Sequence, residues 1–441
     1  IFTSFLIFIA FIFSCLPPIF AVAAETTANT TVTVLCYMNG DNDLSEEVLY
    51  SLDMIETAGS SDSVNIIALV DGHHEWLGRY DAAWARTRVL KVDFDAQIGV
   101  INATVLDDWG EANLADPRTL ERFVRLGINR YPADRYMFYA FAHSQGIIDT
   151  RTFSIQRQAK TLSISNDDTS GQKMDLNQFH DAIKLGLDDR QFEIITLFSC
   201  LTNMVEIGYA FSDITQYLVA SQDEIRLFNE PSRKVRIRGL QFEAAIDALN
   251  KDPAVKAKQI GRILVNSHID NYIQAMPYAS DSERSAGCRL AAGMALIECS
   301  ALPVLVQQLD ALARVMIAGA DDRLFVDAMR EAMKTTPRFP SFLNLEYYDL
   351  HHFVRRLRDN LQHAEVAVQA CNAVLNRLND QVLVYERHTL DLDVKGVSVY
   401  LSNPLVPENI YTAHQFMYSR SRFSIDTRWD EMIACFRYRL Q

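Results

Sequence analysis

A short apolar run that ends at a cysteine constrains the fold of this chain more than any other feature. In Phe192–Met204 (FEIITLFSCLTNM) the apolar and β-branched residues stop just before Cys200, a pattern typical of a buried strand. A second run, Tyr136–Gly146 (YMFYAFAHSQG), stops in the same way at His143. Because the carboxyl ends of adjacent parallel strands border one crevice, the sequence predicts that Cys200 and His143 meet there.

A cysteine and a histidine brought together in this way are a nucleophile and its base. A thiol attacks a carbonyl carbon only as the thiolate, and a neighbouring imidazole is the usual group that removes its proton at neutral pH. Cys200 and His143 are therefore candidates for the catalytic pair of a hydrolase. The alternative is structural, since free cysteines are among the most buried residues and often serve packing alone.

Six segments follow one another in an order found in a known family: Val34–Leu44 (VLCYMNGDNDL), Trp109–Leu120 (WGEANLADPRTL), Asp167–Ile183 (DDTSGQKMDLNQFHDAI), Cys200–Glu206 (CLTNMVE), Tyr217–Ser221 (YLVAS) and Val394–Tyr400 (VKGVSVY). Together they resemble the clostripain-like cysteine peptidases, relatives of caspases, gingipains and legumains. The resemblance implies a caspase-like α/β fold and an endopeptidase that cleaves proteins or peptides through a thioester acyl-enzyme. It also implies that His143 is the catalytic histidine and Cys200 the nucleophile.

The chain departs from the family pattern at two places beside these residues. The family commonly has His-Gly-Gly after the strand, whereas here His143 is followed by Ser144, Gln145 and Gly146. The family also commonly has an aspartate two residues before the cysteine, which is associated with recognition of Arg or Lys before the cleaved bond. Phe198 occupies that position here. We therefore expect the preference for Arg or Lys to be relaxed.

Other candidate site residues follow the ends of strands. We expect backbone N–H groups of Gly146 and Cys200 to stabilise the oxyanion of the reaction. Asp223 and Glu224 follow the strand predicted at Tyr217–Ser221 and are candidates to bind a basic substrate side chain. A solvated loop is an equally good explanation for these two acidic residues.

Asp41 and Asp43 follow the first predicted strand and are candidates to orient His143 or the substrate. A turn that caps the next helix is the alternative explanation. Because some members of the family require calcium, these aspartates and Asp167-Asp168 are also candidate calcium ligands. The sequence has no recognised metal-binding spacing, and no other cofactor is expected.

Predicted strands and helices alternate from residue 25 to 238. This alternation predicts a mostly parallel sheet with helices on both faces, which agrees with the caspase-like α/β/α sandwich implied by the resemblance. Residues 239–441 are predicted to be mainly helical, with a long helix at Val366–Tyr385 and one late strand at Gly396–Leu401. We therefore expect a peptidase core at 25–238 and a helical C-terminal region at 239–441.

Residues 1–24 have the pattern of a secretory signal peptide. Ile1–Phe13 is almost wholly apolar, and small residues follow at Ala21–Ala24. We expect a protein that is secreted or lies in the periplasm or at the cell surface, with no membrane span after signal removal. A lipid-modified Cys15 is the alternative, although Ile12-Phe13-Ser14 is a poor match to a lipobox.

The formal net charge of −14 argues against one large class of partner. Binding to nucleic acid needs clustered Lys and Arg that neutralise phosphates, and an acidic surplus opposes this. We therefore expect protein or peptide substrates and no nucleic-acid partner.

Two alternative functions remain open. Ala142–Gly146 (AHSQG) matches the nucleophile elbow of an α/β-hydrolase, with Ser144 as nucleophile. Such an elbow passes directly into a helix, whereas Ile147–Thr152 is rich in β-branched residues. The other alternative is a caspase-like binding protein without turnover, which the departures at Ser144 and Phe198 suggest.

The stretch between the two predicted catalytic strands is a candidate for self-processing. Asp149–Lys173 is long, polar and basic and lacks a helical period. Members of the family are often cut between the histidine and the cysteine. Surface loops of this composition are easily cleaved, and we expect this loop to occupy the substrate groove until it is cut.

Overall fold

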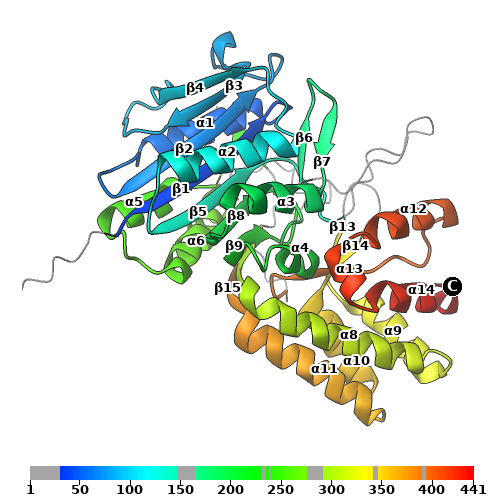
Figure 1. Cartoon of the computed structure of the whole chain (residues 1–441). Helices are drawn as coiled ribbons and strands as arrows, with labels where there is room; N and C mark the ends of the chain where they lie inside the picture. Colours follow the sequence, from blue (N-terminus) through cyan, green and yellow to red (C-terminus); the bar gives the residue numbers. More distant parts are fainter. Residues whose placement is uncertain are drawn as a thin grey trace, which may run out of the picture.

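The computed structural model describes residues 30–147, 164–225, 227–230, 235–237, 240–275, 292–340, 346–389 and 394–441. One nine-stranded sheet forms its centre, in the order β15-β12-β9-β8-β5-β1-β2-β3-β4 (Figure 1). Its strands are β1 (Val32–Gly40), β2 (Val64–Gly72), β3 (Thr87–Lys91), β4 (Thr104–Gly110), β5 (Arg135–Phe141), β8 (Phe192–Phe198), β9 (Thr215–Ser221), β12 (Gly293–Glu298) and β15 (Leu383–His388). Strands β2, β1, β5, β8 and β9 are parallel, and the pairs beyond them on both sides are antiparallel.

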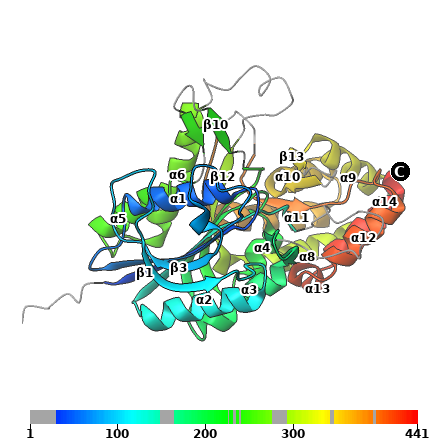
Figure 2. The ribbon, with the colours of Figure 1, turned by 90° about the horizontal axis from the view of Figure 1, so that it is seen from above.

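Helices cover both faces of this sheet (Figures 1 and 2). One face carries α1 (Ser45–Glu56), α5 (Glu243–Lys251) and α6 (Ala257–Ala275); the other carries α2 (Pro117–Arg130), α3 (Leu176–Leu187) and α4 (Val205–Ala210). Along β1, Leu35 and Tyr37 join the core under α2 and α3, whereas Val34 and Cys36 join the core under α1. Side chains alternate between the two faces of a strand, so a strand buried on both faces appears as a continuous apolar run.

The helix predicted after Asp116-Pro117 forms as expected. The Asp116 side chain accepts a hydrogen bond from the N–H of Arg118, and Pro117 occupies the first turn of α2. This position needs no backbone N–H for helical bonding, so proline starts the helix without loss of a hydrogen bond.

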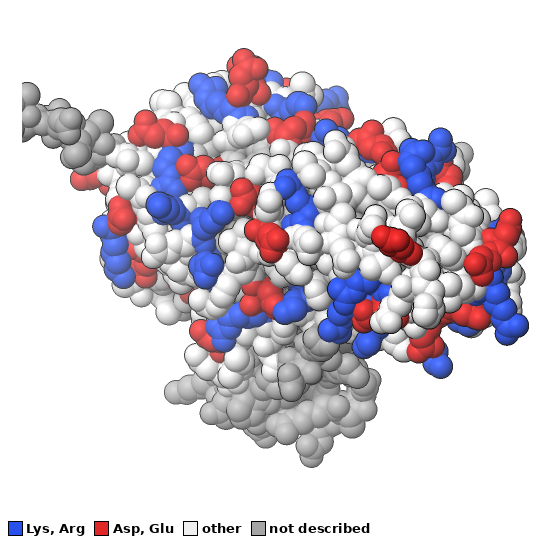
Figure 3. Space-filling view, turned by 90° about the horizontal axis from the view of Figure 1, so that it is seen from below, with Lys and Arg blue, Asp and Glu red and all other residues white. Residues whose placement is uncertain are grey.

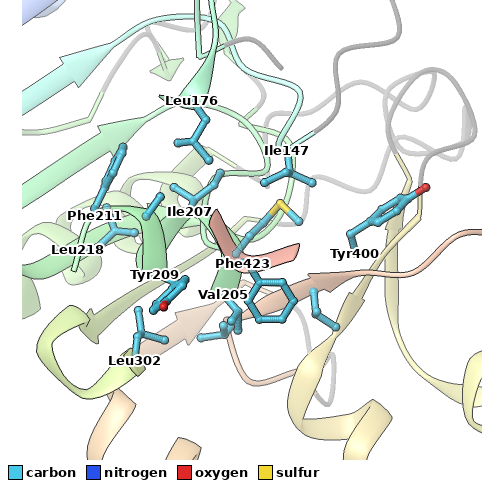
Figure 4. Packing of buried hydrophobic residues seen from close by; sticks show 14 of the residues in the cluster. Ile147, Leu176, Val205, Ile207, Tyr209, Phe211, Leu218, Leu302, Tyr400 and Phe423 are labelled. Carbon is cyan, nitrogen blue, oxygen red and sulfur yellow. The ribbon is translucent and has the colours of Figure 1, made fainter. Parts of the chain in front are cut away.

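The second region packs beside the sheet and contains helices and a small antiparallel sheet, β13-β14-β16. Its elements are α8 (Leu302–Ala318), α9 (Arg323–Thr335), β13 (Arg338–Pro340), β14 (Glu346–Asp349), α10 (Leu350–Asn360), α11 (Glu365–Arg377), β16 (Ser398–Tyr400), α12 (Glu408–Tyr418), α13 (Arg422–Asp426) and α14 (Trp429–Leu440). Two short hairpins, β6 (Ser165–Asp167) with β7 (Gln172–Met174) and β10 (Phe228–Glu230) with β11 (Val235–Ile237), complete the described strands. Figure 4 shows Val205 and Tyr209 of α4 in one apolar cluster with Leu302 of α8 and Phe423 of α13.

The sheet extends across the predicted boundary at residue 238. Beyond the expected late strand, now β16, the second region contributes β12 and β15 to the central sheet. The helix predicted at Val366–Tyr385 ends at Arg377, because a π-helical turn at Leu378–Val382 leads directly into β15. No glycine or proline marks this change in the sequence.

The segment Cys299–Ala318, which includes α8, is long and apolar enough to cross a membrane, and 44% of its most apolar window is buried inside the protein. Leu305, Leu309 and Leu312 of this helix belong to the apolar core. On the face shown in Figure 3, the Lys and Arg side chains are interspersed with Asp and Glu.

Candidate active site

Three neighbouring strands of the sheet lead to three candidate site residues. Cys200 follows β8, His143 follows β5 and Asp43 follows β1, and these strands are adjacent and parallel in that order. Phe198 pairs with Phe141, so Cys200 and His143 each lie two residues beyond a matched pair. The two strands are neighbours, as the sequence predicts, and their carboxyl ends lie at the same level of the sheet.

The turn that contains Cys200 is tied to its surroundings by hydrogen bonds. The N–H of Ile225 donates to the Cys200 Sγ at 3.2 Å. The next residue, Leu201, is buried and has a φ of 57°, a left-handed conformation that is uncommon for a leucine. Its N–H donates to the carbonyl oxygen of Asp223. The chain therefore turns sharply after the cysteine, and the segment after β9 crosses the turn.

His143 contacts Asp43 directly. The His143 Nε2 and the Asp43 Oδ1 lie 2.5 Å apart. The imidazole is mostly buried, with 20% of the side chain exposed, whereas the Asp43 side chain is 63% exposed. With Nε2 engaged by the carboxylate, Nδ1 is the nitrogen that is left to exchange a proton with a nucleophile.

The loop after His143 turns at Gly146, whose φ is 75°. The N–H of Gly146 donates to the Ser144 Oγ at 3.1 Å, and Ser144 is completely buried. Residues 144–147 form no helix, and Gln145 and Ile147 make an isolated bridge instead. The described part of the loop therefore lacks the helix that a nucleophile elbow at Ser144 requires.

The candidate specificity residues lie in two different environments. The Phe198 side chain is buried on the α6 side of the sheet, with its ring centroid 4.8 Å from that of Phe141 and 5.6 Å from that of His268. Asp223 and Glu224 are half-buried in the segment that crosses the Cys200 turn. The acidic pair therefore lies nearer to open solvent than Phe198 does.

Asp41 links the loop after β1 to the β6-β7 hairpin by hydrogen bonds. Its carboxylate accepts hydrogen bonds from the N–H and the Oγ1 of Thr169, at 3.1 and 2.9 Å. Asp167 of the hairpin accepts bonds from the N–H groups of Leu114 and Ser170. Burial, and then the neighbouring carboxyl of Asp167, raise the pKa of Asp41 to about 7. Both carboxyls thus have structural partners.

The candidate calcium ligands Asp41, Asp43, Asp167 and Asp168 each accept hydrogen bonds from the protein. Among the described residues, the group of three ligand-bearing side chains close enough to share a metal is Asp349, His351 and His352, and not the predicted aspartates. Asp349 caps α10, because its Oδ1 accepts bonds from the N–H and the Nδ1 of His352. Its Oδ2 accepts a bond from the Gln222 side chain at 3.0 Å.

Two hydrogen bonds from the second region, which the sequence does not predict, reach the loops at the strand ends. The Tyr347 hydroxyl donates to the carbonyl oxygen of Gln145 at 2.6 Å, and the Ser398 N–H donates to the carbonyl oxygen of Asn203. Both join residues that are far apart in the chain. A single sequence carries no signal for such a pairing.

Known proteins with related sequences and folds are cysteine peptidases. Clostripain of Hathewaya histolytica is 23% identical over 198 residues, which are 42% of this chain and 36% of clostripain, so the match spans about a third of that relative. The structure of a secreted C11 cysteine protease from Bacteroides thetaiotaomicron, in complex with an irreversible peptide inhibitor, has a TM-score of 0.63 at 18% identity and covers 91% of this chain and 99% of its own. An inactive zymogen C11 protease from Parabacteroides distasonis has a TM-score of 0.60 at 18% identity, with 90% and 99% covered.

These likenesses confirm the predicted fold class, a mostly parallel sheet between helical layers. The peptidase C11 family model, described as the clostripain family, matches residues 36–435, which is nearly the whole chain. The family expected from the sequence resemblance is therefore confirmed. The chain belongs to the clostripain family of cysteine peptidases.

Proposed function

We propose that this protein is a secreted cysteine endopeptidase in which Cys200 is the nucleophile and His143 the general base. The observation that carries the proposal is the succession of Cys200, His143 and Asp43 at the ends of three adjacent parallel strands. Membership of the clostripain family supports the same chemistry. Secretion is supported by the apolar N-terminal stretch and by the description of a structural relative as secreted.

The reaction begins when the thiol proton of Cys200 passes to the Nδ1 of His143. The Asp43 carboxylate accepts a hydrogen bond from the Nε2–H and stabilises the imidazolium that forms, as the acid of a catalytic triad does. The thiolate then attacks the carbonyl carbon of the substrate, and the π electrons of the carbonyl move onto its oxygen. Asp43 acts through His143 and is therefore a positioning residue.

The oxyanion is stabilised by the backbone N–H groups of Gly146 and Cys200. The N–H of Gly146 donates to the neutral Ser144 hydroxyl before substrate binds. A negatively charged oxygen is a stronger acceptor than a hydroxyl, so the N–H exchanges Ser144 for the oxyanion as the tetrahedral intermediate forms.

Collapse of this intermediate breaks the peptide C–N bond, and the leaving amine takes the proton from His143. The carbonyl carbon then remains as a thioester of Cys200. His143 removes a proton from a water molecule, which attacks the thioester, and the thiolate of Cys200 departs with the proton returned by His143. The free carboxyl product completes the cycle.

The substrate is a protein or peptide, and the preference for Arg or Lys before the cleaved bond is relaxed. Phe198 presents an apolar side chain where the family commonly has an aspartate, and it is buried against Phe141 and His268. A basic side chain would instead have to meet Asp223 or Glu224. A peptide library cleaved by the wild-type protein and by Asp223→Ala and Glu224→Ala measures this directly. A sharp Arg/Lys preference that both variants retain would contradict this account.

The nucleophile is tested with three variants and a thiol-directed activity probe. Cys200→Ala and His143→Ala should each abolish turnover, and Cys200→Ala should lose labelling, while thermal unfolding stays close to that of the wild type. Ser144→Ala is the matched control and should retain activity within a few fold. Activity that survives Cys200→Ala but not Ser144→Ala would indicate a serine hydrolase. A wild-type protein that neither labels nor cleaves would indicate a binding protein.

A further inference from the structure

We infer that Tyr347 is a positioning residue that aims the Gly146 N–H at the oxyanion. This inference rests on the proposed function. Tyr347 lies on β14 in the second region, 202 positions from Gln145, and its side chain is completely buried. Its hydroxyl donates to the Gln145 carbonyl oxygen at 2.6 Å. The contact is made to the peptide group that carries the Gly146 N–H.

The planarity of that peptide group converts the contact into an orientation. The carbonyl of Gln145 and the N–H of Gly146 belong to one trans peptide unit, in which the two bonds point in opposite directions. A hydrogen bond that holds the oxygen therefore also limits the N–H to a narrow range of directions, within which it can pass from Ser144 to the oxyanion. The N–H points away from Tyr347 and here donates to the Ser144 Oγ.

The tyrosine ring also explains why a glycine stands at position 146. A Cβ on Gly146 would lie 2.7 Å from the Cε2 and Cζ atoms of the Tyr347 ring, which is closer than Cβ atoms approach other atoms in real structures. The φ of 75° separately favours glycine. The ring therefore packs directly on the backbone that carries the proposed oxyanion donor.

The strand that carries Tyr347 is itself anchored to the other loops of the site. Tyr347 and Asp349 are two positions apart and so share a face of β14, and Asp349 accepts a bond from Gln222, which follows β9. The partner strand β16 contributes the Ser398 N–H to the Asn203 carbonyl, beyond Cys200. The small sheet that carries Tyr347 is thus hydrogen-bonded to the loops after β5, β8 and β9.

An oxyanion donor acts on the transition state and leaves ground-state binding unchanged. Loss of such a donor lowers kcat by about 10²–10³-fold, and KM is unaffected. Tyr347→Phe removes only the hydroxyl group. The Gly146 N–H is still present, but the peptide group that carries it loses the hydrogen bond that restricts its direction. We therefore expect kcat to fall by about ten- to a hundredfold with KM unchanged.

The matched control is Tyr400→Phe. Tyr400 pairs with Tyr347 across β16 and β14 and is equally buried, with its ring centroid 6.3 Å from that of Tyr347. Among the described contacts, its hydroxyl makes no bond to Gln145 or Gly146. Tyr400→Phe should keep the wild-type kcat. A fall in both variants to the same extent would point to general loosening of the small sheet and overturn the inference.

The experiment measures kcat and KM on the fluorogenic peptide that the wild-type protein cleaves best, with rates expressed per active site titrated by the thiol-directed probe. The peptide aldehyde of the same sequence, which forms a tetrahedral adduct with a thiol, is the second readout. Tyr347→Phe should weaken aldehyde inhibition by the same factor as kcat. An unchanged kcat per active site, or a rise in KM alone, would overturn the inference.

The proposed function and this inference fail in different ways. If the wild-type protein cleaves the peptide and Cys200→Ala does not, the proposed function holds whatever Tyr347→Phe does. A wild-type kcat in Tyr347→Phe would then reject the positioning role alone. Retained cleavage by Cys200→Ala would reject both.

Discussion

The Ser199 hydroxyl donates a hydrogen bond of 2.7 Å to the carbonyl oxygen of Ala142. The bond is buried and joins the residue before Cys200 to the residue before His143. It crosses between β8 and β5 where their regular pairing ends at Phe198 and Phe141. The two turns that carry the proposed nucleophile and base are thus held to each other by a side chain as well as by the sheet.

Ser199→Ala tests this link. The change leaves the Ala142 carbonyl without its buried donor, which costs about 1–3 kcal/mol of unfolding free energy. Because the spacing of the two turns relaxes, we expect kcat per titrated active site to fall severalfold. Ser51→Ala on α1, another buried serine, is the control and should change stability without changing kcat. Full turnover per active site in Ser199→Ala would show that the link is only structural.

Asp43→Asn tests the positioning of His143. An amide that presents its NH2 group cannot accept a hydrogen bond from the His143 Nε2–H and carries no charge to stabilise the imidazolium. We expect kcat to fall by about tenfold or more, less than for a fully buried acid, because Asp43 is largely exposed. The rate of alkylation by iodoacetamide against pH should also change, since it reports thiolate formation at Cys200. Asp62→Asn, at an exposed position, is the control. If the alkylation rate depends on pH in the same way in Asp43→Asn and Asp62→Asn, Asp43 does not have this role.

Glu206 makes stability depend on pH. Its Oε1 accepts bonds from the Tyr400 N–H and the Tyr418 hydroxyl, and burial raises the pKa of its carboxyl from 4.5 to about 7. Between pH 4.5 and about 7, the Glu206 carboxyl therefore carries a proton in the folded state and is ionised in the unfolded state. The stabilisation is complete below pH 4.5 and disappears as the pH rises through about 7.

Glu206→Gln replaces the protonated acid with a neutral amide at every pH. We expect the variant to unfold at nearly the same denaturant concentration as the wild type at pH 4.5, and to be more stable at pH 8 by up to about 3 kcal/mol. Urea titrations at both pH values measure the difference, with exposed Glu331→Gln as the control. A variant that is equally destabilised at both pH values would contradict the assignment.

Self-processing is expected in the stretch 149–173, most of which lies outside the described residues. Purified wild-type protein should slowly give two fragments that remain associated, because β5 and β8 lie on opposite sides of the cut and pair within one sheet. Cys200→Ala should remain one chain. Fragmentation of Cys200→Ala would mean that another protease makes the cut, and full activity of the intact wild type would show that the loop does not block the site.

Local patterns in the sequence were enough to predict the central strands and the residues at their ends. The apolar runs that end at His143 and Cys200 form adjacent parallel strands, because burial on both faces leaves an unmistakable continuous pattern. The sequence left two explanations for Asp43, a turn that caps the next helix or a group that orients His143. In the structure Asp43 contacts His143. Its catalytic role, like those of the other site residues, stays a prediction.

The parts that were not predicted depend on contacts between distant segments. β15 follows α11 directly through a π-helical turn. Its apolar residues continue the helical spacing of α11, so the sequence shows no break where the strand begins. The hydrogen bond from Tyr347 to Gln145 depends on how the second region packs on the first. Neither residue type nor local spacing identifies such a pair, because many buried tyrosines bond to backbone carbonyls.

The central position of β9 in the sheet has a consequence for how the chain matures. β9 is bordered by β8 on one side and by β12 on the other, and β12 is built from a much later part of the chain. Until Gly293–Glu298 has been synthesised, the apolar edge at Leu218–Ala220 presents unpaired N–H and C=O groups, and such edges nucleate aggregation. The first region therefore depends on a strand of the second region to cover this edge, and we expect a chain that ends before Gly293 to aggregate.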